Sequence, residues 1–259
     1  MRKYSQVFLK SENIADRIAS AAARHAECDF VVEIGPGKGF LTAHLLKRFA
    51  HVTAMEIDPD MVKILRPQFP EDKLTIHNID FLEAGLEGII PAGKKVLFVG
   101  NLPYAVGSAI LQRILEYPDF RAAILMFQKE VCQRIVAQPD TKHYGLLALS
   151  AQSRSHAEFI IDVGKGLFSP VPAVDSGVVE FVRREEKLFE SAEHEAAFFK
   201  FIRAAFAHRR KTILNSLSMG LCVSKEKAGQ LLAAGGINPS ARAETVDMAT
   251  YLRAAKSLL

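Results

Sequence analysis

The sequence predicts an α/β fold, a parallel sheet with helices on both faces, followed by a small all-helical domain. Two observations predict this architecture. Short apolar segments alternate with segments of helical periodicity as far as about residue 137, which is the pattern of βαβ units. Beyond about residue 185 only helical periodicity continues, interrupted by Gly220, Gly235 and Pro239. We therefore expect one domain over 1–186 and a second over 187–259.

Strands and helices are expected to alternate along the first domain. Ser11 is placed to cap a helix over 11–26, and the apolar run 30–34 is typical of a buried strand. Further strands are expected at 51–57, 73–79, 96–99 and 122–127, and further helices at 59–66, 107–116 and 129–137 and through Leu41, Leu45 and Phe49. Because ligands of such sheets bind beyond the carboxyl ends of the strands, the residues that follow each strand are the candidates for a site.

Composition and charge narrow the class of protein. Apolar residues make up 49% of the 259 residues, enough for a sizeable core, and the net charge of +4 suits a polyanionic partner without requiring one. The cysteines Cys28, Cys132 and Cys222 lie far apart without metal-ligand spacing, so we expect neither a disulfide framework nor a metal site. Neither a secretory signal nor a stretch long enough to cross a bilayer is visible, and the cytoplasm is the expected compartment.

A glycine-rich run, EIGPGKG at 33–39, closes the first of these buried strands. Gly35 and Gly37 lack a Cβ, which lets the backbone turn tightly and lets a ligand approach. The G-x-G-x-G spacing differs from that of dinucleotide sites, and by itself it also fits an ordinary strand-to-helix turn. Glu56 ends the next strand, where an acid can accept ribose hydroxyls, and Asp80 follows the third, where a carboxylate can accept an adenine amino group. Together these residues predict a bound adenosine moiety.

The tetrapeptide Asn101-Leu102-Pro103-Tyr104 follows the fourth strand directly. The exocyclic amine of adenine is a poor nucleophile because its lone pair is delocalised into the ring. The Asn101 side-chain oxygen and a backbone carbonyl can accept its two N–H bonds, which exposes the lone pair to an electrophilic methyl group in the transition state. Pro103 stiffens the loop, and Tyr104 offers a face on which the base can stack. The alternative is an Asn-initiated turn with a buried tyrosine.

Phe168 is a second aromatic candidate for the catalytic site. It opens the proline-rich run FSPVP at 168–172, which would hold the ring stiffly against the other face of a flipped base. Core packing explains the same ring equally well, and the sequence leaves both interpretations open.

Several blocks of the chain resemble the ribosomal RNA adenine N6-dimethyltransferase family, in the same order and over almost the whole length. They are SQVFL at 5–9, the run 33–39, EID at 56–58, Asp80, NLPY at 101–104, FQKEV at 127–131, YG at 144–145, FSPVP at 168–172, VDS at 174–176 and RRKT at 209–212. The resemblance implies a Rossmann-like S-adenosylmethionine-dependent methyltransferase sheet. It also implies transfer of two methyl groups to each of two adjacent adenines near the 3′ end of small-subunit (16S) rRNA, within an assembling small ribosomal subunit.

Cofactor contacts for S-adenosylmethionine follow from the same resemblance. They fall on Gln6, Val7, Leu9, Gly35, Gly37, Glu56, Ile57, Asp80, Phe81 and Asn101. Val7 stands where the family usually has Asn, so a side-chain contact there is lost, whereas a backbone contact can survive. Nothing in the sequence indicates an obligate dimer, and we expect a monomer.

Basic residues crowd into one stretch of the predicted helical domain. They are Lys200, Arg203, Arg209, Arg210 and Lys211. Such a cluster can follow a phosphate backbone, with salt-dependent affinity and little sequence information. A solvated helix face is the alternative. With the resemblance, the stretch is expected to bind RNA.

Three other functions remain open at this point. The first is the related methyltransferase of large-subunit rRNA that confers macrolide resistance, against which the run 168–176 and Tyr144-Gly145 argue. The second is a ribosome-assembly factor in which catalysis is secondary. The third is methylation of DNA adenine or protein glutamine, against which Leu102 in the loop and the basic stretch argue.

Overall fold

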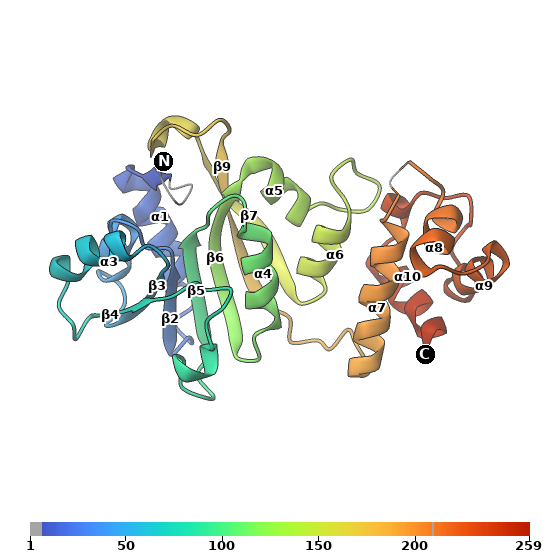
Figure 1. Ribbon diagram of the computed structural model, residues 1–259, viewed down its shortest axis with the longest axis horizontal. Coiled ribbons are helices and arrows are strands. Elements are labelled where there is room, and N and C mark those ends of the chain that lie inside the picture. Colours follow the sequence, from blue (N-terminus) through green and yellow to red (C-terminus); the bar gives the residue numbers. More distant parts are fainter. Residues whose placement is uncertain (1–6, 209) are drawn as a thin grey trace. The chain divides into compact units, whose positions relative to one another are not determined.

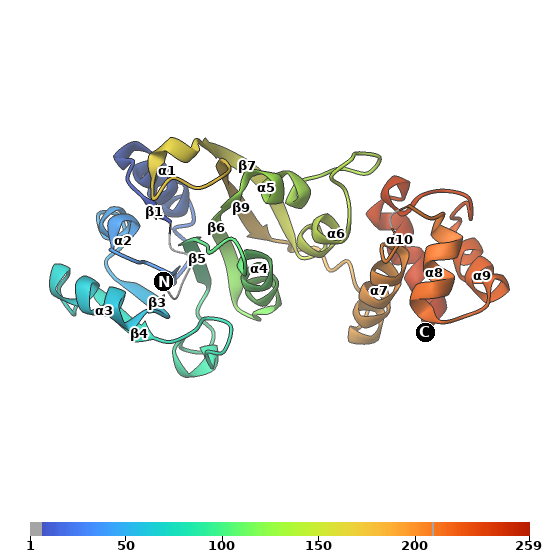
Figure 2. The same cartoon turned by 45° about the horizontal axis from the view of Figure 1, so that its top comes forward.

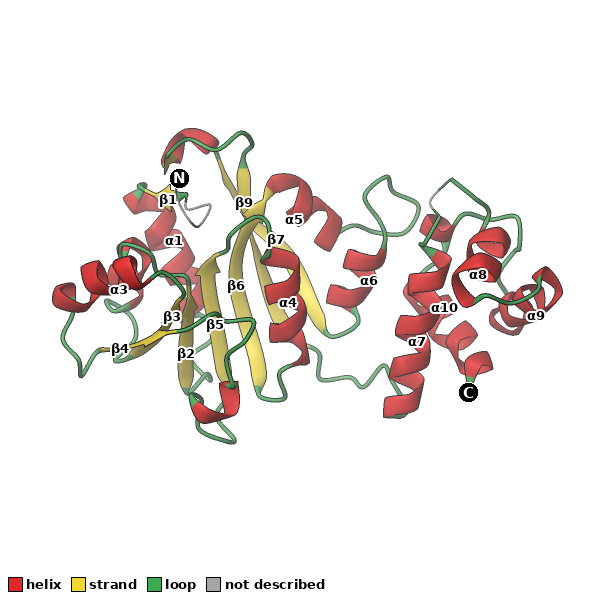
Figure 3. Ribbon diagram, in the orientation of Figure 1, coloured by secondary structure: helices red, strands yellow, loops and turns green. Residues whose placement is uncertain are grey.

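The structure of the protein is a computed structural model, which describes residues 7–208 and 210–259. The chain forms two compact units. The first runs as far as Cys132 and resumes over Ser155–Arg183, and the second comprises Gln133–Arg154 and Arg184–Leu259. Figure 3 shows the strands of the described residues in the first unit and only helices and loops in the second. The domain boundary between 186 and 187 stays a prediction.

The first unit is built on a mixed sheet with the strand order β4-β3-β2-β5-β6-β9-β7 (Figure 1). Its strands are β2 (Phe30–Ile34), β3 (Val52–Glu56), β4 (Leu74–Asn78), β5 (Val96–Asn101), β6 (Phe120–Gln128), β7 (Ser155–Val163) and β9 (Ser176–Arg183). Strands β2 to β6 pair in parallel, whereas β9 is antiparallel to both β6 and β7. The predicted fold class is confirmed. The sheet is not wholly parallel as predicted, however, because it includes β7 and β9, to which the sequence analysis assigned no strand, and β9 pairs antiparallel with both β6 and β7.

Helices cover both faces of this sheet. Both α1 (Glu12–Ala23) and α4 (Gly107–Glu116) contact β6, and Figures 1 and 2 show them on opposite sides of it. Successive side chains of β5 point alternately to the α1 face and to the α4 face of the sheet, as expected for a strand buried on both faces. Leu97 and Val99 join the core that includes α1, whereas the ring of Phe98 meets that of Tyr117, just beyond α4, edge-on at 6.0 Å.

The remaining elements of the first unit are short. They are β1 (Phe8–Leu9) and β8 (Phe168–Ser169), which pair antiparallel, and the helices α2 (Phe40–Leu45), α3 (Pro59–Leu65) and α5 (Lys129–Ile135), whose last residues belong to the second unit. The Oγ of Ser11 accepts the Ile14 N–H, so the predicted cap of α1 is confirmed. Pro67 lies in a 3-10 turn that follows α3, so the α-helix ends at Leu65, one residue earlier than predicted.

The second unit is a helical cluster with a core of its own. Its helices are α6 (Leu146–Gln152), α7 (Ala192–Ala205), α8 (Ile213–Leu221), α9 (Lys225–Gly235) and α10 (Met248–Ala255). Phe198, Phe201 and Tyr251 are fully buried there together with Ala148 and Leu149 of α6, which explains why Gln133–Arg154 belongs to this unit. In the described part of the chain, no helix combines the length and the apolar character needed to cross a membrane.

Candidate active site

The carboxyl ends of four neighbouring parallel strands meet at one edge of the sheet. Strands β4, β3, β2 and β5 end there, and a cavity of about 760 Å³ opens beyond them. The predicted residues that line it are Val7, Leu9, Gly35, Gly37, Glu56, Ile57, Asp80, Phe81, Asn101, Leu102, Pro103 and Tyr104. The structure therefore brings nearly all the predicted cofactor and catalytic positions to one cavity. Gln6 lies outside the described residues.

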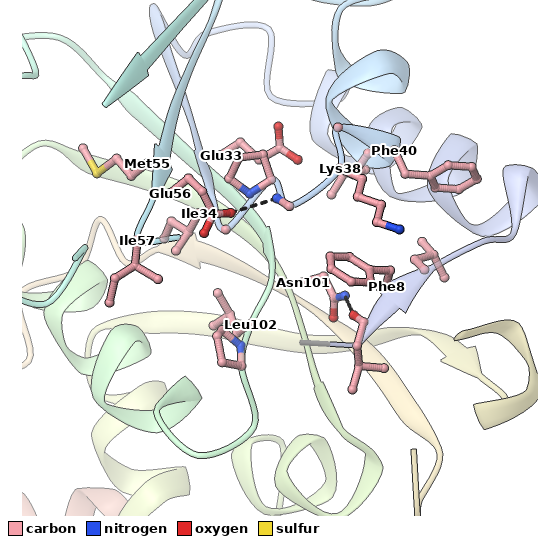
Figure 4. Close-up of a pocket in the computed structure, with 18 of the residues that line it drawn as sticks. Phe8, Glu33, Ile34, Lys38, Phe40, Met55, Glu56, Ile57, Asn101 and Leu102 are labelled. Carbon is pink, nitrogen blue, oxygen red and sulfur yellow. Dashed lines mark hydrogen bonds between the residues drawn. The ribbon is translucent and has the colours of Figure 1, made fainter. Parts of the chain in front are cut away.

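The glycine loop after β2 forms one wall of the cavity. Gly35 has a φ of +66°, and a Cβ built on it would meet no atom within 4 Å, so the open space beside its backbone is available to a ligand. Gly37 has a φ of +57°, and a Cβ there would come within 2.9 Å of the Phe8 ring. The ring of Phe8 therefore lies directly against this loop, with the Lys38 Nζ 5.0 Å from its centre (Figure 4).

Glu56 links the glycine loop to the end of β3. One carboxylate oxygen accepts the backbone N–H of Gly37 at 2.9 Å (Figure 4). The other accepts the backbone N–H of Asp58, also at 2.9 Å. The residue is 3% exposed, and burial raises the pKa of its carboxyl, opposed by these hydrogen bonds. Each carboxylate oxygen can accept more than one hydrogen bond, so the fixed carboxylate retains acceptor capacity for a ligand in the cavity.

Asp80 begins the turn that follows β4. Its Oδ1 accepts the Leu82 N–H at 2.8 Å, and its own side chain is half-buried at the cavity wall. Phe81 is buried beside it, edge-on to Phe98 with 6.0 Å between ring centres. Ile57 is 38% exposed and contributes an apolar wall. A carboxylate beside apolar walls suits a flat heterocycle that carries an amino group.

Asn101 is the last residue of β5, and its amide is oriented by the N-terminal segment just before β1. The Asn101 Nδ2 donates to the Val7 carbonyl at 3.0 Å, which leaves Oδ1 as an acceptor for a substrate (Figure 4). This contact uses the backbone of Val7, so it does not depend on the Asn side chain that the family pattern has at this position.

The rest of the loop 101–104 is held by three further bonds. The Leu102 N–H donates to the Met126 carbonyl at 3.2 Å, and the Pro103 carbonyl accepts the Val106 N–H at 3.2 Å. The Tyr104 hydroxyl pairs with the Ser176 Oγ at 2.8 Å. The tyrosine ring is therefore tethered at its far end, while the residue remains half-buried at the cavity. The loop is preorganised rather than a free turn.

Comparison with known proteins identifies the family. A family model described as ribosomal RNA adenine dimethylase matches residues 1–259. The chain belongs to this family. Its relatives include "Ribosomal RNA small subunit methyltransferase A" of Desulfitobacterium hafniense, 40% identical over 95% of this chain and 88% of the relative. The protein of the same name from Lactococcus lactis subsp. lactis is 37% identical over 100% and 90% of the two chains.

Two solved structures extend the comparison. A 23S rRNA methyltransferase, ErmE, aligns with a TM-score of 0.72 and 31% identity, covering 97% of this chain and 99% of its own. A dimethyladenosine transferase from Plasmodium falciparum aligns with a TM-score of 0.76 and 23% identity over 95% of both chains, and that likeness concerns the fold alone.

Membership of the dimethylase family makes the protein an S-adenosylmethionine-dependent methyltransferase. The cavity fits this cofactor, since open space lies beside the Gly35 backbone and two fixed acids, Glu56 and Asp80, face a nucleoside-sized volume. Among the residues that the structure describes, no three His, Cys, Asp or Glu side chains are grouped closely enough to hold a metal ion.

Phe168 packs in the core of the first unit. Its ring is fully buried in the core with Leu9 and Ile18, and it is absent from the cavity wall. The reason is the pairing of β8 with β1, in which Phe168 lies opposite Leu9 and its ring is directed into the core. This packing is what the core interpretation expects. A contact of the Phe168 ring with a flipped base stays a prediction.

Glu33 is a cavity residue for which the sequence analysis proposed no function. It is 1% exposed, and its Oε2 accepts the Thr42 hydroxyl at 2.6 Å. Burial raises the pKa of its carboxyl to about 8, with a smaller contribution from the negative charge of Glu56. Its position immediately before the glycine loop was the sequence signal that could have marked Glu33 as a residue of the site. Ser176, the partner of Tyr104, lies in the VDS block of the family resemblance, but its contact with Tyr104 was not predicted because β9 was not.

The basic residues of the second unit are on its surface where the structure describes them. Lys200, Arg203, Arg210 and Lys211 are exposed. The Arg203 guanidinium lies over the Phe199 ring, 5.8 Å from its centre, within the range of a cation–π contact. Arg209 lies outside the described residues.

Proposed function

We propose that the protein transfers methyl groups from S-adenosylmethionine to N6 of two adjacent adenines near the 3′ end of 16S rRNA. The products are N6,N6-dimethyladenosines, formed during biogenesis of the small ribosomal subunit in the cytoplasm, by a monomeric enzyme. The observation that carries the proposal is the oriented amide of Asn101, whose Oδ1 is left as an acceptor at the cavity. The identity of 37–40% to small-subunit methyltransferases supports the choice of substrate.

Asn101 activates the target amine. Its Oδ1 accepts one N–H of the adenine amino group, and a loop carbonyl accepts the other. The Pro103 carbonyl is already engaged by Val106, which favours the Leu102 carbonyl for this purpose. Two acceptors draw the nitrogen toward tetrahedral geometry, and the freed lone pair attacks the methyl carbon. The gain is larger in the transition state than in the ground state, which is what accelerates the reaction.

Binding and orientation account for the rest of catalysis. S-adenosylmethionine, when bound, supplies an electrophilic methyl group on a sulfonium that becomes a neutral thioether. Glu56 would hold the ribose hydroxyls, Asp80 the adenine amino group, and Val7 and Leu9 would close the cavity from the N-terminal strand. Tyr104 holds the target base through its tethered ring. The proton of the methylated amine leaves to water, so the chain needs no strong general base.

RNA binding is assigned to exposed basic side chains of the second unit. Lys200, Arg203, Arg210 and Lys211 are exposed there, and Arg209 is included from the sequence. Exposed charges of this kind contact phosphates and contribute affinity without reading sequence. The shape of an assembling small subunit would then select the site, as is common for RNA.

The experiment that tests this function compares two substrates. Purified small and large ribosomal subunits lacking the modification are incubated with the protein and cofactor labelled in the methyl group. We expect label in small-subunit RNA. Label confined to large-subunit RNA would instead support the second candidate, a 23S rRNA methyltransferase, which the 31% identity to ErmE over nearly the whole chain favours.

A further inference from the structure

Helix α4 connects the catalytic loop to the opposite side of the cavity. It begins at Gly107, three residues after Tyr104, and carries Arg113 near its other end. The Arg113 guanidinium reaches the turn at residues 80–84, which follows β4. There its Nη1 donates to the Leu82 carbonyl and its Nη2 to the Ala84 carbonyl. The same guanidinium lies 5.8 Å from the centre of the Phe81 ring.

The 80–84 turn cannot satisfy these carbonyls by itself. Its N–H groups are paired internally, since the Asp80 carbonyl accepts from Glu83 and Ala84 and the Asp80 carboxylate accepts from Leu82. Ala84 is fully buried, so its carbonyl requires a partner from the protein. Arg113 supplies donors to two carbonyls of the turn at once, which is the arrangement its planar fork suits.

We propose that Arg113 is a positioning residue for the adenine of the cofactor. By bridging the two carbonyls and covering one side of Phe81, it fixes the turn that presents Asp80 and Phe81 to the cavity. The proposal rests on the proposed function, because that function assigns Asp80 to the adenine of S-adenosylmethionine, and Phe81 lines the same cavity beside Asp80.

Arg113 acts on cofactor binding rather than on the chemical step. The catalytic loop has its own restraints, from Asn101 to Val7, from Leu102 to Met126 and from Tyr104 to Ser176, and none of them involves Arg113. A change at Arg113 therefore raises KM for the cofactor and leaves kcat and KM for RNA close to their wild-type values. If Arg113 contributed only packing, its replacement would lower thermal stability but would not raise KM for the cofactor selectively.

Three variants test the proposal. Arg113→Ala removes both donors, and Arg113→Lys keeps the charge and can donate to one carbonyl at a time. Gln112→Ala is the control, because Gln112 is exposed on the same helix and bonds to Glu116. Calorimetry measures Kd for S-adenosylhomocysteine and for 5′-methylthioadenosine, which lacks the amino-acid part. Methylation assays give kcat and both KM values, and circular dichroism checks folding.

We expect Arg113→Ala to raise both Kd values, and KM for S-adenosylmethionine, about tenfold, with kcat within about twofold of wild type. Arg113→Lys should raise the same Kd and KM values about threefold, between the wild type and Arg113→Ala. It remains the decisive variant if Arg113→Ala does not fold. Unchanged Kd values in a folded Arg113 variant, or a loss for S-adenosylhomocysteine without one for 5′-methylthioadenosine, would overturn the proposal. If wild-type protein binds both nucleosides but methylates no rRNA, the proposed function fails, and the Kd values still decide the role of Arg113.

Discussion

The cofactor cavity of the first unit and the basic residues of the second unit hold their polar groups in different ways. Glu56 and Asn101 are each fixed by hydrogen bonds within the protein, and Glu56 is almost fully buried. Lys200, Arg210 and Lys211 are exposed on the surface of the second unit. A buried, oriented group acts at one atom, so its removal has a large and specific effect. An exposed charge is screened by salt, so it contributes only a small part of the affinity for RNA.

The largest effect is expected from Asn101→Ala. The variant loses the acceptor that we propose to activate the amine, so kcat should fall by at least about 10²-fold, while RNA affinity stays within about twofold. Asn13→Ala, an exposed asparagine on α1, is the control. Single-turnover methylation and filter binding measure the two quantities. Methylation that persists near the wild-type rate would show that Asn101 does not activate the amine.

Glu56→Gln should weaken cofactor binding with little effect on RNA binding. The amide keeps one oxygen, but its NH₂ group would face the N–H of Gly37 or Asp58 in place of an acceptor. We expect Kd for S-adenosylhomocysteine to rise about 10- to 100-fold by calorimetry. Asp60→Asn, at an exposed acid on α3 paired with Lys63, should leave Kd unchanged. A wild-type Kd for Glu56→Gln would remove Glu56 from the cofactor site.

Glu33 gives the cavity a dependence on pH that the exposed residues lack. Its pKa is raised to about 8 in the folded protein against 4.5 for an ordinary Glu. Between these values the native state holds a proton that the unfolded state has released, so the free energy of unfolding falls as pH rises through this window. Glu33→Gln has no such proton and should lose less stability.

Thermal unfolding at pH 5 and at pH 8 measures this effect. We expect Tm of the wild type to fall by at least about 3 °C more than that of Glu33→Gln over this interval. The exposed Glu71→Gln should follow the wild type. Equal falls for the wild type and Glu33→Gln would mean that Glu33 is ionised in the folded protein.

The smallest effects are expected in the second unit. Arg210→Ala should weaken RNA binding less than about fivefold at physiological salt and lower the slope of log K against log salt by about 1. Lys63→Ala, an exposed lysine of the first unit, is the control and should leave the slope unchanged. Filter binding over a series of salt concentrations measures both. An unaltered slope for Arg210→Ala would show that this charge makes no phosphate contact.

The sequence predicted the cavity better than the rest of the molecule because strand ends converge in a parallel sheet. Glu56, Asp80 and Asn101 could be placed together once each was seen to follow a strand. The side of the sheet formed by β7 and β9 was not predicted, because antiparallel pairing of segments this late in the chain leaves no βαβ alternation to detect. The contact of Ser176 with Tyr104 was missed for the same reason.

Contacts between distant segments were the second limit of prediction. Nothing in the run 168–172 reveals that β8 pairs with β1, and that pairing is what puts Phe168 in the core. The bond from Asn101 to the Val7 carbonyl is equally invisible, because a backbone acceptor is independent of the side chain at that position. The bridge from Arg113 to the 80–84 turn likewise joins residues about thirty positions apart.

The most direct test of the central claim is to map methylated adenines on small-subunit particles after reaction with the protein and S-adenosylmethionine. Primer extension or mass spectrometry of RNA fragments reads each position. We predict N6,N6-dimethyladenosine at two adjacent adenines near the 3′ end of 16S rRNA with the wild type, and none with Asn101→Ala. Modification at other positions, or equal modification by both proteins, would contradict the account.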